Sequence, residues 1–145
     1  MVAPIVLFLA ILIVGILRPE YSHISQAISE LGARDTPFNK VLHYAGLMPA
    51  GILTLAFSLA MFRRLKRECL LYLSSSYVAV VGITRFLAGI FPCDPGCFPI
   101  ITITGRLHTV SGLTSLFAGT LAPLVMMLGL RHQNLQALCS VSWCH

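Results

Sequence analysis

Long apolar runs alternate with short polar connections along the whole chain. Four runs stand out, over residues 1–17, 41–62, 69–91 and 107–130. Each is close to the roughly 17 to 25 residues that an α-helix needs to cross about 30 Å of hydrocarbon. Because no water satisfies an exposed backbone inside a bilayer, helices are the expected form of these runs. We predict an all-α integral membrane bundle of about four transmembrane helices, formed by residues 1–130.

The first connection, residues 18–40, has a pattern of its own. Apolar residues recur at helical spacing from Ile24 to Leu31, between a suitable N-cap, Ser22, and a suitable stop, Gly32. Such a stripe is typical of a short helix that lies on the membrane surface. We therefore predict a short extracytoplasmic surface helix over residues 22–31.

Positive charges indicate how the helices are oriented. Residues 63–68 contain four basic side chains among six residues. The positive-inside rule places this connection in the cytoplasm, so both termini are expected there too, with residues 18–40 and 92–105 outside the cell membrane. The tail, residues 131–145, has no apolar run long enough to span and no clear periodicity, and we expect it to be cytoplasmic and disordered.

The composition agrees with a membrane protein and excludes some partners. Of 145 residues, 57% are hydrophobic and 10% are charged, too few charges to cover a water-soluble globule. The net charge of +5 comes from side chains that separate apolar runs and do not line one basic face, so we expect membrane lipids and no nucleic acid as partners. Small residues recur in the later runs and favour helix–helix association, within the chain, with another copy or with another membrane protein.

Three polar residues within the predicted spans need an explanation because polar groups in hydrocarbon are costly. Arg85, His43 and His108 lie toward the outer ends of their helices, and each shares a helical face with small residues. We therefore predict that they face the bundle interior as one polar cluster. Asp94 or Glu30 is expected to join this cluster and pair with Arg85.

The residues of the predicted outer side admit two interpretations. Histidines near acids and a serine can form a zinc site or a nucleophile with its base. On that interpretation His23, His43 and His108 are the candidate metal ligands, and three others are candidate catalytic groups: Asp94, Glu30 and Ser22. On the structural interpretation, an acid pairs with Arg85 and the histidines cap loops or lie at the level of the lipid headgroups. The absence of HExxH or a comparable spacing favours the structural interpretation.

The five cysteines are an odd number, so they cannot all pair within one chain. Cys93 and Cys97 flank a turn that contains Pro95 and Gly96. A small disulfide and two free thiols are both open for this pair. Cys139, Cys144 and His145 lie together in the tail, where we expect them to be inert.

Several of these residues resemble a known family. The run Tyr21–Ala33, the turn Phe91–Pro95 and His108 are similar to the bacterial and archaeal multi-pass membrane proteins classified as domain of unknown function 998. The resemblance covers about residues 12–130. It implies about six spans where this chain offers four, so we expect a truncated or divergent copy. It implies no established activity.

Two functions of different kind follow from these observations. The first is a non-catalytic membrane protein with a structural or assembly role, for which the composition and the small residues suffice. The alternative is a membrane-embedded, metal-dependent lipid hydrolase with its site at the extracytoplasmic face. Zinc would be its cofactor, and Asp94 or Glu30 its base. A transporter is disfavoured because no span carries an acidic residue near its middle.

Overall fold

The computed structural model describes residues 2–65 and 68–142, with side chains described as far as His132. Within these residues it contains helices and no strand, which confirms the predicted fold class. The elements, in chain order, are α1 (Ala3–Ile16), α2 (Ile28–Leu31), α3 (Asn39–Val41), the π-helix η1 (Leu42–Leu47), α4 (Met48–Arg64), α5 (Cys69–Ile90) and α6 (Ile103–Ser142).

Three helical segments of the described chain are long and apolar enough to cross a membrane. They are Asn39–Arg64, in which α3, η1 and α4 run without interruption, Cys69–Ile90, and Ile103–His132. Helix α1 is a shorter apolar helix of 14 residues, about 21 Å long at the α-helical rise and so shorter than the hydrocarbon core. The chain is thus a bundle of about four helices, three of them long enough to span and α1 shorter.

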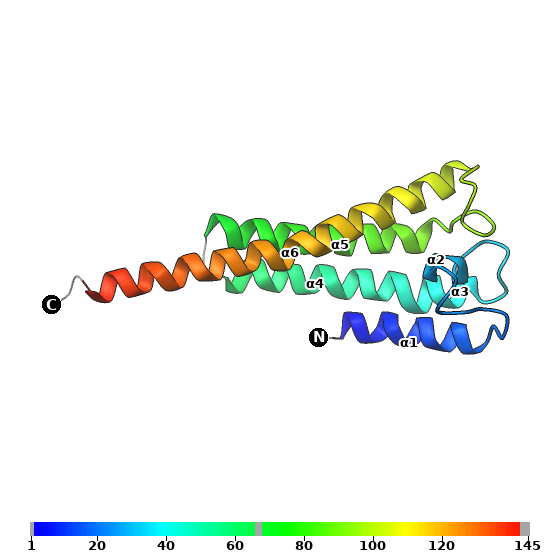
Figure 1. Cartoon of the computed structure of the whole chain (residues 1–145), viewed down its shortest axis with the longest axis horizontal. Helices are drawn as coiled ribbons and strands as arrows, with labels where there is room; N and C mark the ends of the chain where they lie inside the picture. The colour runs from blue at the N-terminus through cyan, green and yellow to red at the C-terminus, as the bar shows by residue number, and fades with distance from the viewer. Residues whose placement is uncertain (1, 66–67, 143–145) are drawn as a thin grey trace.

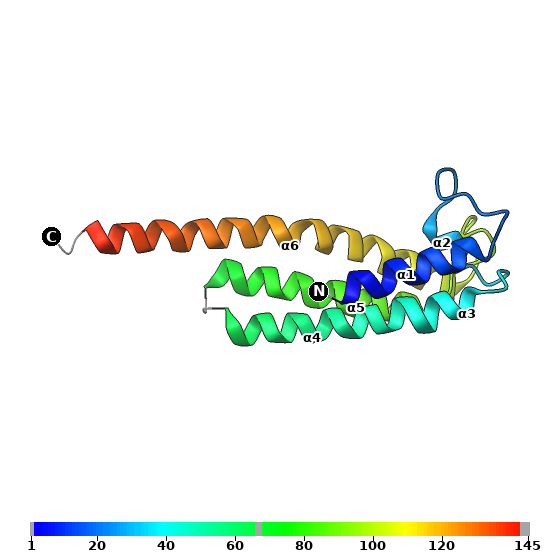
Figure 2. The ribbon, with the colours of Figure 1, turned by 90° about the horizontal axis from the view of Figure 1, so that it is seen from below.

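Helix α5 is the centre of the bundle. It packs along α4 on one side and along α6 on the other, whereas α1 packs against η1 and α4 (Figure 1, Figure 2). At the α4–α5 crossing, a Cβ atom added to Gly51 or to Gly82 would collide with backbone atoms of the opposite helix. The two glycines therefore allow the backbones to touch, which is how helices associate without a hydrophobic driving force between them.

The π-helix η1 directly precedes α4, whose second residue is Pro49. A proline ring lacks an N–H and clashes with the carbonyl four residues earlier, here that of Ala45. Widening the preceding turn relieves that clash. The same turn carries His43, which is buried in the bundle.

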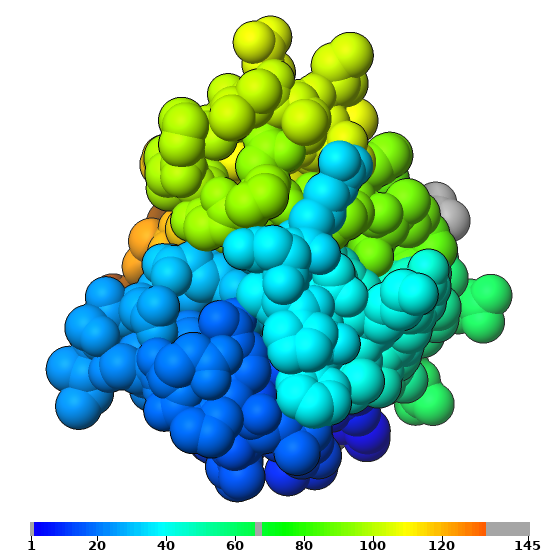
Figure 3. Space-filling view, turned by 90° about the vertical axis from the view of Figure 1, so that its right-hand side faces the viewer, coloured from blue at the N-terminus to red at the C-terminus, as the bar shows by residue number. Residues whose placement is uncertain are grey.

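The two long connections lie together at one end of the bundle, opposite the α4–α5 turn, and cover that end (Figure 1, Figure 3). We call this the loop end. The first connection is fastened by a small apolar core of Val14, Tyr21, Leu31 and Leu42. The loop end is therefore packed onto the helices.

The predicted surface helix over residues 22–31 is wrong in its bounds, because α2 is a single turn, Ile28–Leu31. The backbone of Ala27 is extended, and its N–H donates to the Glu30 carboxylate, so Ala27 is the N-cap where we had predicted Ser22. Ile24 is 99% exposed and does not join the apolar side of the helix. The side-chain oxygen of Gln26 accepts the Ser22 N–H, and the backbone N–H of Gln26 donates to the Ser22 carbonyl. These two bonds hold residues 22–26 in a turn.

Helix α6 continues through Ser142, where we had expected a disordered tail from residue 131. Nothing after Pro123 breaks the helix, and the stretch 135–138, Leu-Gln-Ala-Leu, consists of strong helix formers. Cys144 and His145, which we expected to be inert, lie outside the described residues, and the side chain of Cys139 is not described.

Candidate functional site

Buried His43 connects two parts of the loop end. The residue is 4% exposed, and its Nδ1 lies 3.0 Å from the carbonyl oxygen of Gly89 while its Nε2 lies 2.8 Å from that of Gly32. Gly89 belongs to the last turn of α5, whose carbonyls have no partner within the helix. Gly32 directly follows α2. His43 thus holds the end of α2 against the end of α5.

His108 closes the same end of α5 from the other side. Its Nδ1 lies 2.8 Å from the carbonyl oxygen of Phe91, the residue that directly follows α5. The rings of His43 and His108 are 6.5 Å apart between centroids, in an edge-on arrangement. The structure therefore brings these two histidines together, and both contact backbone oxygens, as the structural interpretation of the sequence expects.

Arg85 lies on α5, about 8 Å along the helix axis from its last residue, Ile90. It is partly buried and lines a cavity of about 430 Å³ together with His108. Within the described part of the chain, the ion pair present is that of Arg18 with Glu20. The expected pair between Arg85 and Glu30 or Asp94 is therefore not formed.

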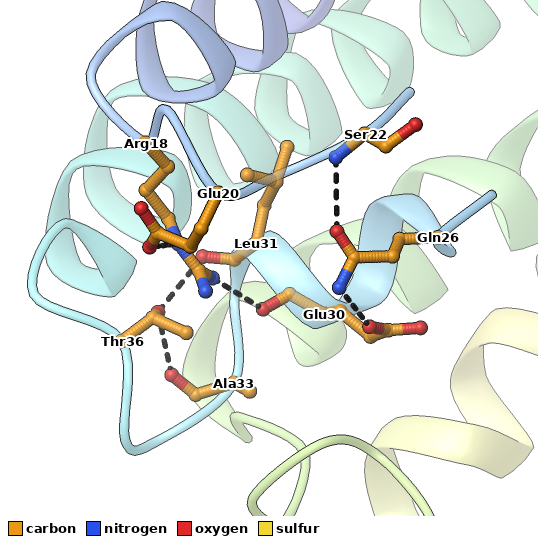
Figure 4. A network of polar contacts seen from close by, with 8 residues as sticks. All are labelled: Arg18, Glu20, Ser22, Gln26, Glu30, Leu31, Ala33 and Thr36. Atoms are coloured by element: carbon orange, nitrogen blue, oxygen red, sulfur yellow. Dashed lines mark hydrogen bonds and ion pairs between the residues drawn. The ribbon is translucent and has the colours of Figure 1, made fainter. Parts of the chain in front are cut away.

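The Glu30 carboxylate accepts hydrogen bonds from the residues that directly precede its own helix, α2. One carboxylate oxygen accepts the N–H of Ala27 at 3.1 Å. The other accepts the side-chain amide of Gln26 at 3.3 Å, as Figure 4 shows. Arg18 donates to the Glu30 carbonyl at 3.3 Å and to the Glu20 carboxylate at 2.9 Å, which lowers the pKa of Glu20. Glu30 therefore caps α2 and does not approach Arg85.

The remaining residues in Figure 4 complete this network. The Ser22 N–H donates to the side-chain oxygen of Gln26 at 2.9 Å. The buried Thr36 hydroxyl lies 2.9 Å from the Leu31 carbonyl oxygen and 2.8 Å from that of Ala33. These bonds fasten the chain on both sides of α2. At Ser22 the bond uses the backbone N–H and not the hydroxyl, which was a candidate catalytic group from the sequence.

Asp94 closes the second connection. The residue is 2% exposed, and one carboxylate oxygen accepts the N–H groups of Ile101 at 2.8 Å and Thr102 at 2.9 Å. The other oxygen accepts the Thr102 hydroxyl. The hydrogen bonds from Thr102 lower the pKa of Asp94, with help from Ile101 and the charge of Arg34. Asp94 is thus an ionised clamp that joins both ends of the loop.

A disulfide between Cys93 and Cys97 forms the base of this loop and decides the question that the sequence left open. The Arg34 guanidinium donates to the Thr104 hydroxyl at 2.7 Å, and the backbone N–H of Arg34 donates to the Cys93 carbonyl at 3.3 Å. The two connections of the loop end are therefore bonded to each other.

The three candidate metal ligands are not assembled. His23 stacks edge-on against Tyr21, with ring centroids 4.9 Å apart, and lies over Gly15, whereas His43 and His108 contact each other. Among the described residues, no group of three or more His, Cys, Asp or Glu side chains could hold a metal ion. The zinc site considered from the sequence has no assembled ligand set in this structure.

Two residues of the loop end were missed from the sequence. Thr102 holds Asp94, but the pairing depends on how the loop folds back and leaves no local signal. Ser111 lines the cavity beside Arg85, and its position three residues after His108 places it on the same helical face. Helical spacing was therefore a signal that could have found Ser111.

The fold and the loop end define the class of the chain, a multi-pass membrane protein with long apolar helices. It belongs to the family described as "Protein of unknown function (DUF998)", whose sequence model matches residues 1–144. This confirms the family predicted from the motifs and extends the match beyond residues 12–130. No curated protein and no solved structure matches the chain.

The Asp94 clamp leads to a prediction about stability. Replacing Asp94 by Asn removes the negative charge and one of the two oxygens that together accept three hydrogen bonds, and should lower the melting temperature by several degrees, whereas Asp35→Asn, at an exposed position of the other connection, should not. Because its pKa is lowered in the folded protein, the stabilisation by Asp94 is complete above its unfolded pKa of about 3.9 and is lost as the pH falls through the folded pKa.

Thermal unfolding in detergent between neutral and acid pH measures both effects. The difference between wild type and Asp94→Asn should shrink on acidification. An equal difference at every pH, or equal melting temperatures for the two Asn variants, would show that Asp94 is not an ionised clamp.

Proposed function

We propose that the chain is a non-catalytic multi-pass membrane protein with a structural or assembly role. The observation that supports this proposal is how the candidate catalytic groups are used. The Asp94 and Glu30 carboxylates and both ring nitrogens of His43 are engaged with groups of the protein itself. A base or nucleophile must keep an atom free to face a substrate. These groups instead hold the connections of the loop end.

Helix α6 is the element that we propose for assembly. Within an apolar 18-residue stretch of α6, 17% of the residues are buried, compared with 33% in the corresponding stretch of each of the other two long spans. Phe117 is 69% exposed and Leu124 is 54% exposed. Since α6 packs along α5 alone among the long helices, most of its surface is available to another helix. A second copy of the chain is the partner we propose, because twofold self-association is the commonest form of assembly.

Photo-crosslinking in membranes tests this assembly. With p-benzoylphenylalanine at position 117, we expect a crosslinked dimer of the chain, because Phe117 lies on the free side of α6. The same group at position 59, where Leu59 is 58% exposed on α4, is the matched control and should give little dimer. Equal yields at the two positions, or no dimer from position 117, would contradict the proposed role of α6.

We also propose that the loop end faces the outside of the cell membrane, with both termini in the cytoplasm. Two observations support this orientation. Arg63 and Arg64 end α4 on the opposite side of the bundle, where the positive-inside rule expects the cytoplasm. The Cys93–Cys97 disulfide belongs to the loop end and favours an oxidising compartment.

Single-cysteine labelling of intact cells tests the orientation. In a background with serine at positions 69, 139 and 144, Ile24→Cys should react with a membrane-impermeant maleimide, and Arg63→Cys should react only after the cells are lysed. Both positions are exposed, so accessibility does not separate them. The reverse pattern of labelling would overturn the orientation.

A further inference from the structure

The cavity beside Arg85 lies between helices that are distant in the sequence. It has a volume of about 430 Å³, within the roughly 300 to 1,000 Å³ of small-molecule sites. Leu7 and Ile11 of α1 form one wall, Leu113 and Leu116 of α6 form another, and α5 contributes Arg85 between them. The cavity is therefore mostly apolar, with polar groups at few positions.

Among the residues that line this cavity, Arg85 is the one whose side chain is always charged. Within the described residues it forms no ion pair and no hydrogen bond to another side chain or to the backbone. Its distance from the end of α5, about 8 Å, corresponds to the boundary between headgroups and acyl chains if α5 ends at the membrane surface. An uncompensated guanidinium at this depth is costly, and an anion bound beside it would offset that cost.

Ser111 supplies a second, independent observation. It is 7% exposed and lines the cavity, and its hydroxyl makes no hydrogen bond within the described part of the chain. Buried hydroxyls without a partner are rare in proteins. A ligand in the cavity would satisfy this one.

His108 determines which kind of anion fits best. A carbonyl oxygen can only accept, so the Nδ1 that faces Phe91 carries the hydrogen in the neutral ring. Its Nε2 is then an acceptor, and it has no partner among the described residues. A phosphate monoester with one remaining hydroxyl can accept from Arg85 and Ser111 and donate to this nitrogen. A carboxylate or a phosphodiester has no hydrogen to donate there.

We infer that this cavity binds a membrane lipid with a phosphate monoester headgroup. Arg85 and Ser111 donate to the phosphate oxygens, and His108 Nε2 accepts the phosphate hydroxyl. The acyl chains leave along the apolar walls of α1 and α6 toward the bilayer. This binding site is separate from the surface of α6 around Phe117, so the site and the proposed assembly can fail independently.

Native mass spectrometry of the whole protein in a non-ionic detergent tests the site. We expect one phosphatidic acid to be retained per chain, and retention at least about tenfold weaker for phosphatidylglycerol, oleate and phosphatidylcholine, which lack either a net negative charge or a hydroxyl on the anionic group itself. Arg85→Gln and Ser111→Ala should each reduce the retention of phosphatidic acid. Arg106→Gln removes an exposed charge in the first turn of α6 and is the control. It should change the retention of phosphatidic acid by no more than about twofold.

A cavity-filling variant keeps the test valid if removing Arg85 impairs folding. A Cβ atom at Gly112 meets no atom within 4 Å, so Gly112→Leu can fill the cavity without a clash at its first carbon. It should abolish retention while the melting temperature stays near that of the wild type. Retention that survives Gly112→Leu, equal retention of phosphatidylglycerol or oleate, or equal competition by inorganic phosphate would each overturn the proposal.

Discussion

Free carbonyl oxygens at the C-terminal end of α5 are the constraint on which the loop end depends. A helix that ends at a membrane boundary leaves its last carbonyls without partners, and a buried carbonyl left unpaired is costly. Here two histidines from different helices satisfy them, His43 at Gly89 and His108 at Phe91. Because His43 also bonds Gly32, the same ring that closes α5 fixes the position of α2.

The other polar groups of the loop end extend this arrangement. Asp94 closes the second connection, Glu30 caps α2, and Arg34 bonds the two connections together. The residues that looked most suited to chemistry are thus the ones that build the rigid end of the bundle. Arg85 is different, because it lines a cavity with no acid beside it. That contrast separates the structural polar groups from the proposed lipid site.

The helices were predictable because length and apolar character suffice to identify a span. Gly82 was also recognisable as a packing residue. The contacts of the loop end were not predictable, since the partners of His43, His108 and Asp94 are backbone atoms, apart from the Thr102 hydroxyl, and no sequence pattern identifies a backbone partner. The predicted ion pair of Arg85 with Glu30 or Asp94 is wrong for the same reason, because both carboxylates accept hydrogen bonds from backbone amides instead.

Hydrogen exchange over residues 28–36 tests most directly whether His43 holds the loop end together. A neutral imidazole donates through one nitrogen only, so His43→Phe leaves at least one of the two buried carbonyls unpaired, at a cost of about 1 to 3 kcal/mol. Amides in this stretch should therefore exchange about tenfold faster or more. Tyr44→Phe, at the exposed neighbouring position, is the control and should exchange as the wild type does. Wild-type exchange over residues 28–36 in His43→Phe would contradict the structural role of this histidine.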